Sequence, residues 1–257
     1  MILTKNLYGI PTGTKRTNGE VQSRKAMHMP KAVKIKRPDD RDMCPPGYHR
    51  VHGYERICES GTKTWVDPHN AKNPKRKVAI YHGSNLLYLY WHADLGQLPA
   101  VNPVADFGDF HELDPLIQFW LPYWQSQGLD FPIGMNALVV KALIAVESGF
   151  NPSRIAGPTG GRGLMQMLKG SIRTLRGVKD KFGYREVKNQ CMVISPDDVL
   201  NPVINIAAGT RWLAHKYALI RTLPAKTLFN TLKNYNQNNE EGEEYARRVL
   251  DLYNESK

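Results

Sequence analysis

The sequence predicts a mainly α-helical protein that carries a small β-hairpin-containing module near its N-terminus. Three observations lead to this prediction. Residues 138–150 are apolar on nearly every helical face, residues 201–220 combine a helix start signal with one apolar face, and residues 44–66 hold two β-prone runs around a Ser-Gly turn. With 257 residues and 41% apolar content, the chain is long enough for one full core and a smaller module.

The formal net charge of +11 at pH 7 implies an anionic partner. Nucleic acid, an anionic membrane and an anionic wall polymer all meet this condition, and charge alone does not choose among them. Residues 1–43 hold ten Lys or Arg and four acidic residues, with few large apolar ones. We interpret them as a basic, flexible N-terminal arm; a recognition segment for an export machine or an anionic surface is the alternative.

The chain shows no targeting or membrane-spanning pattern. Residues 1–11 lack a charged segment followed by an apolar run, and the longest apolar run, residues 137–146, is interrupted by Lys141. We therefore predict no signal peptide and no transmembrane segment.

Residues 44–100 are predicted to form a small Cys-containing module and linker. Cys44, His49, His52 and Cys58 are ligand types that suit zinc, but their spacing is not a common one. A disulfide between Cys44 and Cys58 is favoured over zinc if the protein works outside the cytoplasm. No metal is predicted.

The segment that follows is predicted to connect the module to a larger domain. Residues 67–85 are polar and basic, which is typical of a connection. Ser84 is expected to cap a helix that passes through Trp91 and stops near Gly96. Residues 99–110 form a further linker, and the domain boundary is placed there.

The larger domain is predicted over residues 111–257 and is helical. Asp114 and Pro115 are expected to cap and open its first helix, which ends near Gly128. Gly209 lies inside a predicted helix, where glycine costs about 1 kcal/mol relative to alanine, so we expect it to pack closely against another helix. The other helical segments are residues 138–150, 164–175, 202–220 and 228–235 and a last helix through Tyr245, Val249 and Tyr253.

One carboxylate, Glu147, stands at the end of the apolar 138–150 segment. Apolar surroundings and the C-terminal end of a helix both disfavour the ionised form, so a raised pKa is expected, as suits a general acid. A solvated glutamate at a helix end is the ordinary alternative. The glycine-rich loop over residues 154–163 favours the functional interpretation, because sites are built on loops that rigid helices hold.

Five motifs occur in a fixed order: Glu-Ser-Gly-Phe-Asn-Pro at 147–152, Gly-Leu-Met-Gln at 163–166 with Gly-Ser behind it, Asn-Ile at 205–206, Tyr-Asn at 235–236, and Glu241 with Tyr245. Together they resemble the soluble lytic transglycosylase (SLT) family, relatives of goose-type lysozyme, over about residues 112–257. The resemblance implies a lysozyme-like α-helical catalytic domain. Lys169 and Asn238 stand where the family usually has proline and glycine.

The resemblance implies a reaction and a set of site residues. Glu147 would be the catalytic acid and base that cuts the β-1,4 bond between N-acetylmuramic acid and N-acetylglucosamine and forms a 1,6-anhydro product, with no cofactor. Arg154 and Arg162 are outside the family motifs, and we expect them to meet stem-peptide carboxylates. The implied substrate-binding residues are Ser148, Met165, Gln166, Tyr235, Asn236 and Glu241.

The absence of a second nearby carboxylate favours this reaction over hydrolysis. Two-carboxylate glycosidases need a second Asp or Glu, and none lies between Glu147 and Gln166; the next are Asp180, Glu186 and Asp197. A lysozyme-like muramidase stays as an alternative, as does a catalytically inactive wall-binding or assembly module. No motif that reads nucleic acid is recognised, so no specific nucleic-acid partner is expected.

Residues 44–65 joined to this domain are similar to leaderless wall-degrading effectors of the bacterial type VI secretion system. We therefore expect a protein that is made in the cytoplasm, exported by a specialised secretion system, and active in the periplasm of a target cell. Its expected partners are peptidoglycan glycan strands, a periplasmic immunity protein and a component of the secretion apparatus. A phage tail-associated lysin and a component of another secretion apparatus are the alternatives.

Overall fold

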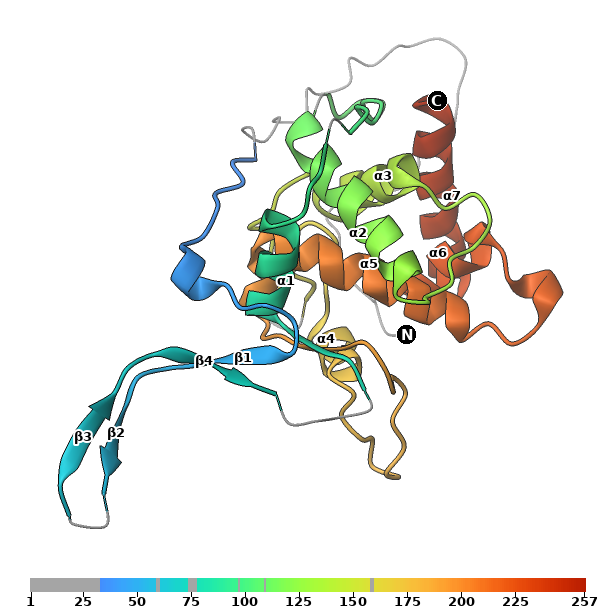
Figure 1. Ribbon diagram of the computed structural model, residues 1–257. Coiled ribbons are helices and arrows are strands. Elements are labelled where there is room, and N and C mark those ends of the chain that lie inside the picture. Colours follow the sequence, from blue (N-terminus) through green and yellow to red (C-terminus); the bar gives the residue numbers. More distant parts are fainter. Residues whose placement is uncertain (1–32, 59–60, 74–77, 97, 109, 158–159) are drawn as a thin grey trace, which may run out of the picture.

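The computed structural model describes residues 33–58, 61–73, 78–96, 98–108, 110–157 and 160–257. They form a helical body from which a long, narrow β-ribbon projects (Figure 1). The predicted mainly α fold is confirmed. Most of the predicted N-terminal arm lies outside the described residues. No helix in the described part of the chain is long and apolar enough to cross a membrane.

Helix α5 occupies the centre of the body and contacts α1, α2, α4 and α6. Its start is the predicted one, because the Asn201 side chain accepts a hydrogen bond from the Val203 N–H at 2.9 Å and Pro202 follows the cap. The helices are α1 (Gly83–Trp91), α2 (Asp114–Ser126), α3 (Ala137–Ser148), α4 (Lys169–Leu175), α5 (Pro202–Ala218), α6 (Leu228–Asn236) and α7 (Glu240–Glu255).

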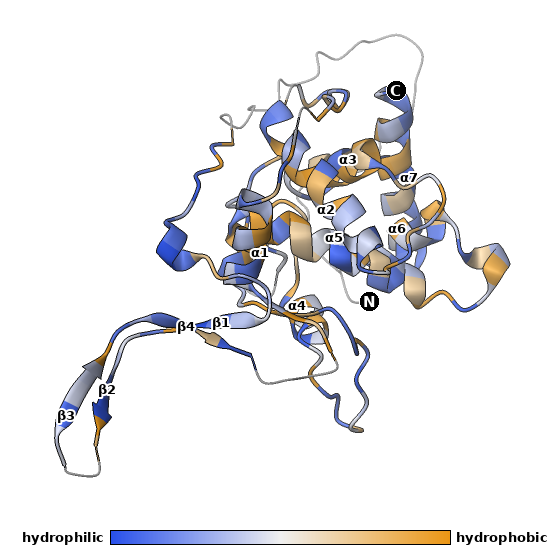
Figure 2. Cartoon of the chain, viewed as in Figure 1, coloured by the Kyte–Doolittle hydropathy of each residue, from blue (hydrophilic) through white to orange (hydrophobic). Residues whose placement is uncertain are grey.

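Helix α3 packs between α2 and α7 and is hydrophobic along most of its length (Figure 2). The Asn136 side chain caps its start by accepting from the Val139 N–H at 3.1 Å. Gly149 ends it in the left-handed conformation, with φ of 58°. Because its residues from Val139 to Ser148 are all buried, Glu147 is delivered to the interior of the body.

Asp114, which was predicted to cap α2, has a different role. Leu113 is the N-cap residue, and the buried Asp114 carboxylate lies 2.8 Å from the Nζ of Lys141, which has no exposed surface. The other Asp114 oxygen accepts from the Val101 N–H at 3.0 Å. This buried ion pair fastens the start of α2 to the middle of α3 and to the segment that precedes α2.

The β-ribbon contains the predicted hairpin. Strand β2 (Tyr54–Ile57) pairs antiparallel with β3 (Lys63–Val66), and β1 (Tyr48–Val51) pairs with β4 (His69–Lys72). The interpretation of residues 67–85 as a connection is wrong, because β4 and β5 (Ile80–His82) lie within them. Strand β5 pairs in parallel with β6 (Cys191–Val193), which joins two segments that are far apart in the sequence.

Residues on both sides of the predicted 99–110 linker share one core. Leu86 of α1 and Phe110 are buried in the same hydrophobic cluster as Trp124 and Leu143. Helix α1 starts after His82, whose N–H donates to the Asn85 side chain at 2.8 Å, so the predicted Ser84 cap is wrong. The described residues of α1 and Phe110 therefore pack as part of the helical body.

The predicted disulfide is absent, and both cysteines are free. Cys44 is buried at the base of the ribbon, where its N–H donates to the Ser84 carbonyl at 3.2 Å, whereas Cys58 follows β2 at the far end of the ribbon. The two residues are separated because the chain between them runs outward along β1 and β2. Among the described residues, no three His, Cys, Asp or Glu side chains are arranged to hold a metal ion.

Candidate functional site

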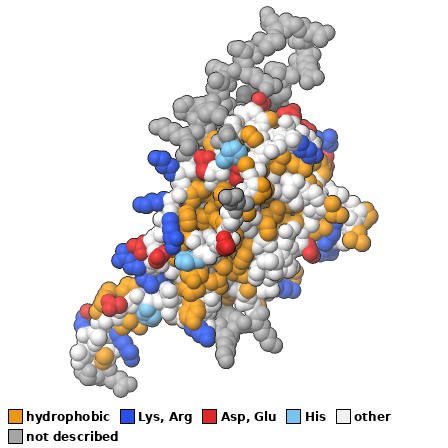
Figure 3. All heavy atoms as spheres, turned by 45° about the horizontal axis from the view of Figure 1, so that its top comes forward, with side chains coloured by type: hydrophobic (Ala, Val, Ile, Leu, Met, Phe, Trp, Pro, Cys, Tyr) orange, Lys and Arg blue, Asp and Glu red, His pale blue; other side chains and the backbone are white. Residues whose placement is uncertain are grey.

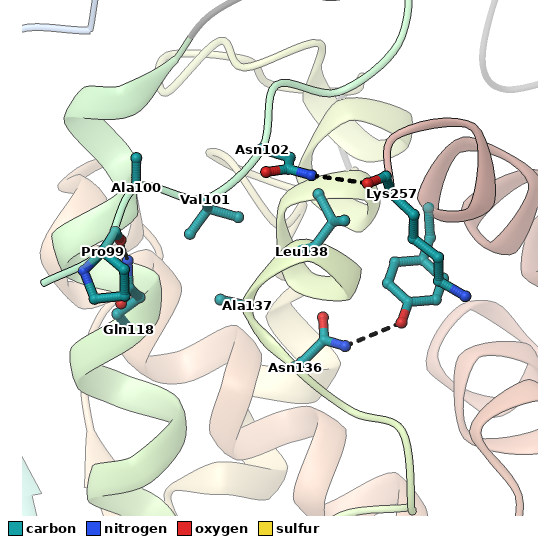
Figure 4. Close-up of a pocket in the computed structure, with 10 residues that line it drawn as sticks. Pro99, Ala100, Val101, Asn102, Gln118, Asn136, Ala137, Leu138 and Lys257 are labelled. Carbon is teal, nitrogen blue, oxygen red and sulfur yellow. Dashed lines mark hydrogen bonds between the residues drawn. The ribbon is translucent and has the colours of Figure 1, made fainter.

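A cavity of about 140 Å³ opens at the C-terminal end of α3. Its walls come from α3, from described residues of the 156–168 loop, and from α4, α5 and α6. It differs from a wider, shallower cavity of about 400 Å³ at the opposite, N-terminal end of the same helix, where Asn136 and Leu138 lie near Asn102 and Lys257 (Figure 4). The polar and aromatic side chains that line the cavity at Glu147 are those of Glu147, Gln166, Ser171, Trp212, Tyr235 and Asn236.

Glu147 is the acidic group of this cavity and is only 5% exposed. Burial raises the pKa of its carboxyl to about 7, and the Tyr245 hydrogen bond and the charges of Arg154 and Arg248 oppose that shift. The expected direction of the shift is confirmed. At neutral pH the group is therefore divided between its acid and base forms, as a group that both gives and takes a proton requires.

Tyr245 of α7 fixes the orientation of this carboxyl. Its hydroxyl donates to Oε1 of Glu147 at 2.8 Å, while Oε2 makes no hydrogen bond with the described residues. This leaves Oε2 as the oxygen with a free position for the acid proton. Sequence reasoning recognised Tyr245 as part of a motif but gave it no role, because the contact joins residues 98 positions apart.

Tyr245→Phe is expected to lower the turnover rate by about tenfold and to raise the pKa of Glu147, because the removed hydroxyl favours the ionised form. The pH profile of cleavage, measured from pH 5 to 9, should move its alkaline limb to higher pH. Tyr253→Phe, a tyrosine of the same helix that bonds to Asn136 instead, is the matched control. A lower rate with an unmoved profile would contradict this role for Tyr245.

Gln166 lines the cavity and holds the loop that forms this wall. The residue is 8% exposed, and its backbone is left-handed, with φ of 45°. Its Nε2 donates to the carbonyls of Gly163 at 2.7 Å and Arg154 at 3.2 Å, which fixes the amide orientation. Its Oε1 is buried and has no hydrogen-bond partner among the described residues.

Two further predicted residues lie on the α6 side of the cavity. The Tyr235 hydroxyl donates to the Met165 carbonyl at 2.7 Å and thereby fastens the loop to α6. Asn236 is the last residue of α6 and is half-buried. Trp212 of α5, which sequence reasoning did not single out, supplies the aromatic wall.

Three predicted substrate-binding residues lie away from the cavity. The Ser148 hydroxyl is buried and donates to the Ile144 carbonyl at 3.1 Å. Met165 has no exposed surface and packs against Gly209, where an added Cβ would come within 2.7 Å of its Cε. Glu241 is exposed at the start of α7 and accepts from the Gln237 side chain.

The predicted 164–175 helix begins only at Lys169. The left-handed backbone at Gln166 turns the chain, so Met165 points into the core and Met167 lines the cavity. The expected close packing at Gly209 is confirmed by the same contact with Met165. Asn238 stands where the family usually has glycine. Its φ is not positive, so the backbone at this position does not need the left-handed conformation that favours glycine.

The other acidic residues considered from the sequence are engaged elsewhere. Asp197 lies 2.9 Å from Arg162, and Glu186 lies 2.8 Å from the His215 ring. Asp180 accepts from backbone N–H groups of its own loop. Among the described residues that line the cavity, Glu147 is the one carboxylate.

Residues 133–249 match the family model of the transglycosylase SLT domain. This part of the chain is an SLT domain. No curated protein and no solved structure matches the chain. The SLT domain is a peptidoglycan-acting domain of the lytic transglycosylase or lysozyme-like type, so the match confirms the resemblance seen in the sequence. It contains α3 to α6 and most of α7, and therefore all the cavity residues named above together with Tyr245.

Proposed function

We propose that this protein is a peptidoglycan lytic transglycosylase that cuts the N-acetylmuramic acid-β-1,4-N-acetylglucosamine bond and forms 1,6-anhydro-N-acetylmuramic acid. The observation that carries the proposal is a buried carboxyl with a pKa of about 7 in a cavity of an SLT domain. A hydrolase with two carboxylates needs a second acidic wall residue, and none is present among the described ones.

In the first half of the reaction, the protonated carboxyl of Glu147 gives its proton to the glycosidic oxygen as the bond from that oxygen to C1 of the muramoyl sugar breaks. In the second half, the resulting carboxylate takes the proton of the muramoyl C6 hydroxyl as that oxygen bonds to C1. No water is consumed, and Glu147 returns to its protonated state. A pKa near neutrality serves both halves.

The cavity walls suit a sugar. The Trp212 ring offers an apolar surface to a sugar face, and the Gln166 amide holds the loop that lines the same cavity. Tyr235 and Asn236 of α6 complete the wall. These groups orient the substrate while Tyr245 orients the acid.

The test is the mass of the products that the full chain releases from purified peptidoglycan. Anhydro-muropeptides support the proposal. Products heavier by one water would replace it with the muramidase reaction. Binding to the wall without any product would replace it with the wall-binding module.

We further propose that the protein is an exported antibacterial effector that acts in the periplasm of a target cell. The resemblance of residues 44–65 joined to the SLT domain supports this role. Expression with an added periplasmic targeting segment should lyse a bacterial host, whereas expression without it should not. Equal growth of both cultures would contradict the periplasmic site of action.

A further inference from the structure

A third cavity, of about 290 Å³, lies between α4 and the loop that follows it and is called here the α4-loop cavity. Ser171 of α4 lines the Glu147 cavity, and Thr174, three residues later, lines this one. Residues three apart are neighbours on one side of a helix, so the two cavities reach α4 at neighbouring positions. The charged residues that line the α4-loop cavity are Arg173, Lys179, Asp180, Lys181 and Glu186.

Cations outnumber carboxylates in and around this cavity. Residues 173–188 contain six Lys or Arg and two acidic residues. Both acidic residues line the cavity and keep their negative charge: Asp180 accepts from the N–H groups of Phe182 at 2.9 Å and Tyr184 at 2.8 Å, and Glu186 is held by His215. Among the described residues, the cations of Arg173, Lys179 and Lys181 make no ion pair with any acidic group.

The loop that carries these cations has a defined shape. The Asp180 N–H donates to the Tyr184 carbonyl at 2.8 Å, and Gly183 has the positive φ, 81°, that this tight turn needs. Val187 anchors its end in the core. The Phe182 and Tyr184 rings nevertheless stand outside, at 82% and 57% exposure. Cations and apolar rings are thus presented together on a fixed turn.

We propose that the α4-loop cavity binds the carboxylates of the stem peptides of a peptidoglycan strand whose sugars occupy the Glu147 cavity. The inference rests on the proposed function. Stem peptides carry carboxylates and short aliphatic side chains, which match the cations and the exposed rings. Of the two arginines that the sequence put forward for this role, Arg162 is paired with Asp197 and the charge of Arg154 acts on the Glu147 carboxyl, so the cations beyond α4 are the ones left to meet a stem peptide.

The test measures binding of the full chain to cell-wall material in a Glu147→Gln background, so that no cleavage occurs. Lys179→Ala with Lys181→Ala removes two of the cations, and Arg221→Ala with Lys226→Ala removes the same charge from the α5–α6 connection. Sedimentation is compared on sacculi that retain their stem peptides and on glycan strands stripped of them by an amidase. We expect the first pair to weaken binding to peptide-bearing sacculi by about threefold to tenfold, with the control pair near the parent.

Binding to the stripped glycan strands should be the same for the Lys179/Lys181 variant and for the Arg221/Lys226 control variant. Equal binding of all proteins to peptide-bearing sacculi would overturn the inference. Equal loss on both materials, or equal loss in the control pair, would also overturn it, because either result indicates general charge attraction. The proposed function is judged separately, by the products that the chain with Glu147 intact releases.

Discussion

Glu147→Gln is expected to lower the rate of peptidoglycan cleavage by about 10³-fold or more, because the amide can neither give nor take the proton on which both halves of the reaction depend. The amide has nearly the same shape, and its carbonyl can still accept from the Tyr245 hydroxyl. Glu241→Gln is the matched control, since that carboxylate is exposed and lies outside the cavity. A Glu147→Gln protein that retained a tenth of the parent rate would remove Glu147 from the mechanism.

The same substitution is expected to stabilise the fold at alkaline pH. The pKa of Glu147 is about 7 in the folded protein and 4.5 in the reference state, so the folded state binds more protons between these values and stability falls as pH rises through them. Above pH 7 the buried, ionised Glu147 lowers the free energy of unfolding by about 3 kcal/mol. Glu147→Gln should recover most of it at pH 8 and little at pH 4.5, as measured by urea unfolding. An equal effect at both pH values would contradict the buried, raised-pKa state.

Asp114→Ala is expected to destabilise the protein by about 3–5 kcal/mol, because it leaves the Lys141 charge buried without its partner. The Arg162–Asp197 pair is the control: its separation is similar, but the Asp197 side chain is 87% exposed, so Asp197→Ala should cost at most about 1 kcal/mol. Urea unfolding of both variants provides the comparison. Similar losses would mean that burial of the Asp114 pair is unimportant.

A double variant separates the pair from its surroundings. Lys141→Met together with Asp114→Ala should cost less than the sum of the single changes, by about 1–3 kcal/mol, because the second change removes the stranded charge. Additive losses would show that the two side chains act independently.

The helix that carries Glu147 was predictable because its signals are local. The apolar run over residues 138–150 predicted the helix, and Gly149, which ends it, lies within that run; the capping Asn136 is a further local signal that was not used. The direction of the pKa shift followed from the same run. Asn201 and Pro202 likewise predicted the start of α5.

The missed features depend on contacts that periodicity does not record. The left-handed backbone at Gln166 was not predicted. It places Met165 in the core, where a substrate-binding role was expected, and Met167 in the cavity wall. Strands β5 and β6 have three residues each, too few for an alternating pattern, and they pair across more than a hundred positions of the chain. Tyr245 and Glu147 are separated by a similar number of positions in the sequence. Only the closed fold brings such residues together.

The β-ribbon has a consequence for behaviour in concentrated solution. Each of its sheets has two strands among the described residues, so backbone donors and acceptors along both outer edges are open to another chain, the usual start of aggregation. Arg50, Arg56 and Lys72 place positive charge along these strands and repel a like edge, whereas Lys63 is paired with Glu55 at 3.0 Å. Salt screens such repulsion, with a Debye length near 8 Å at about 0.15 M. High ionic strength should therefore promote aggregation of this protein well before it affects the fold of the body.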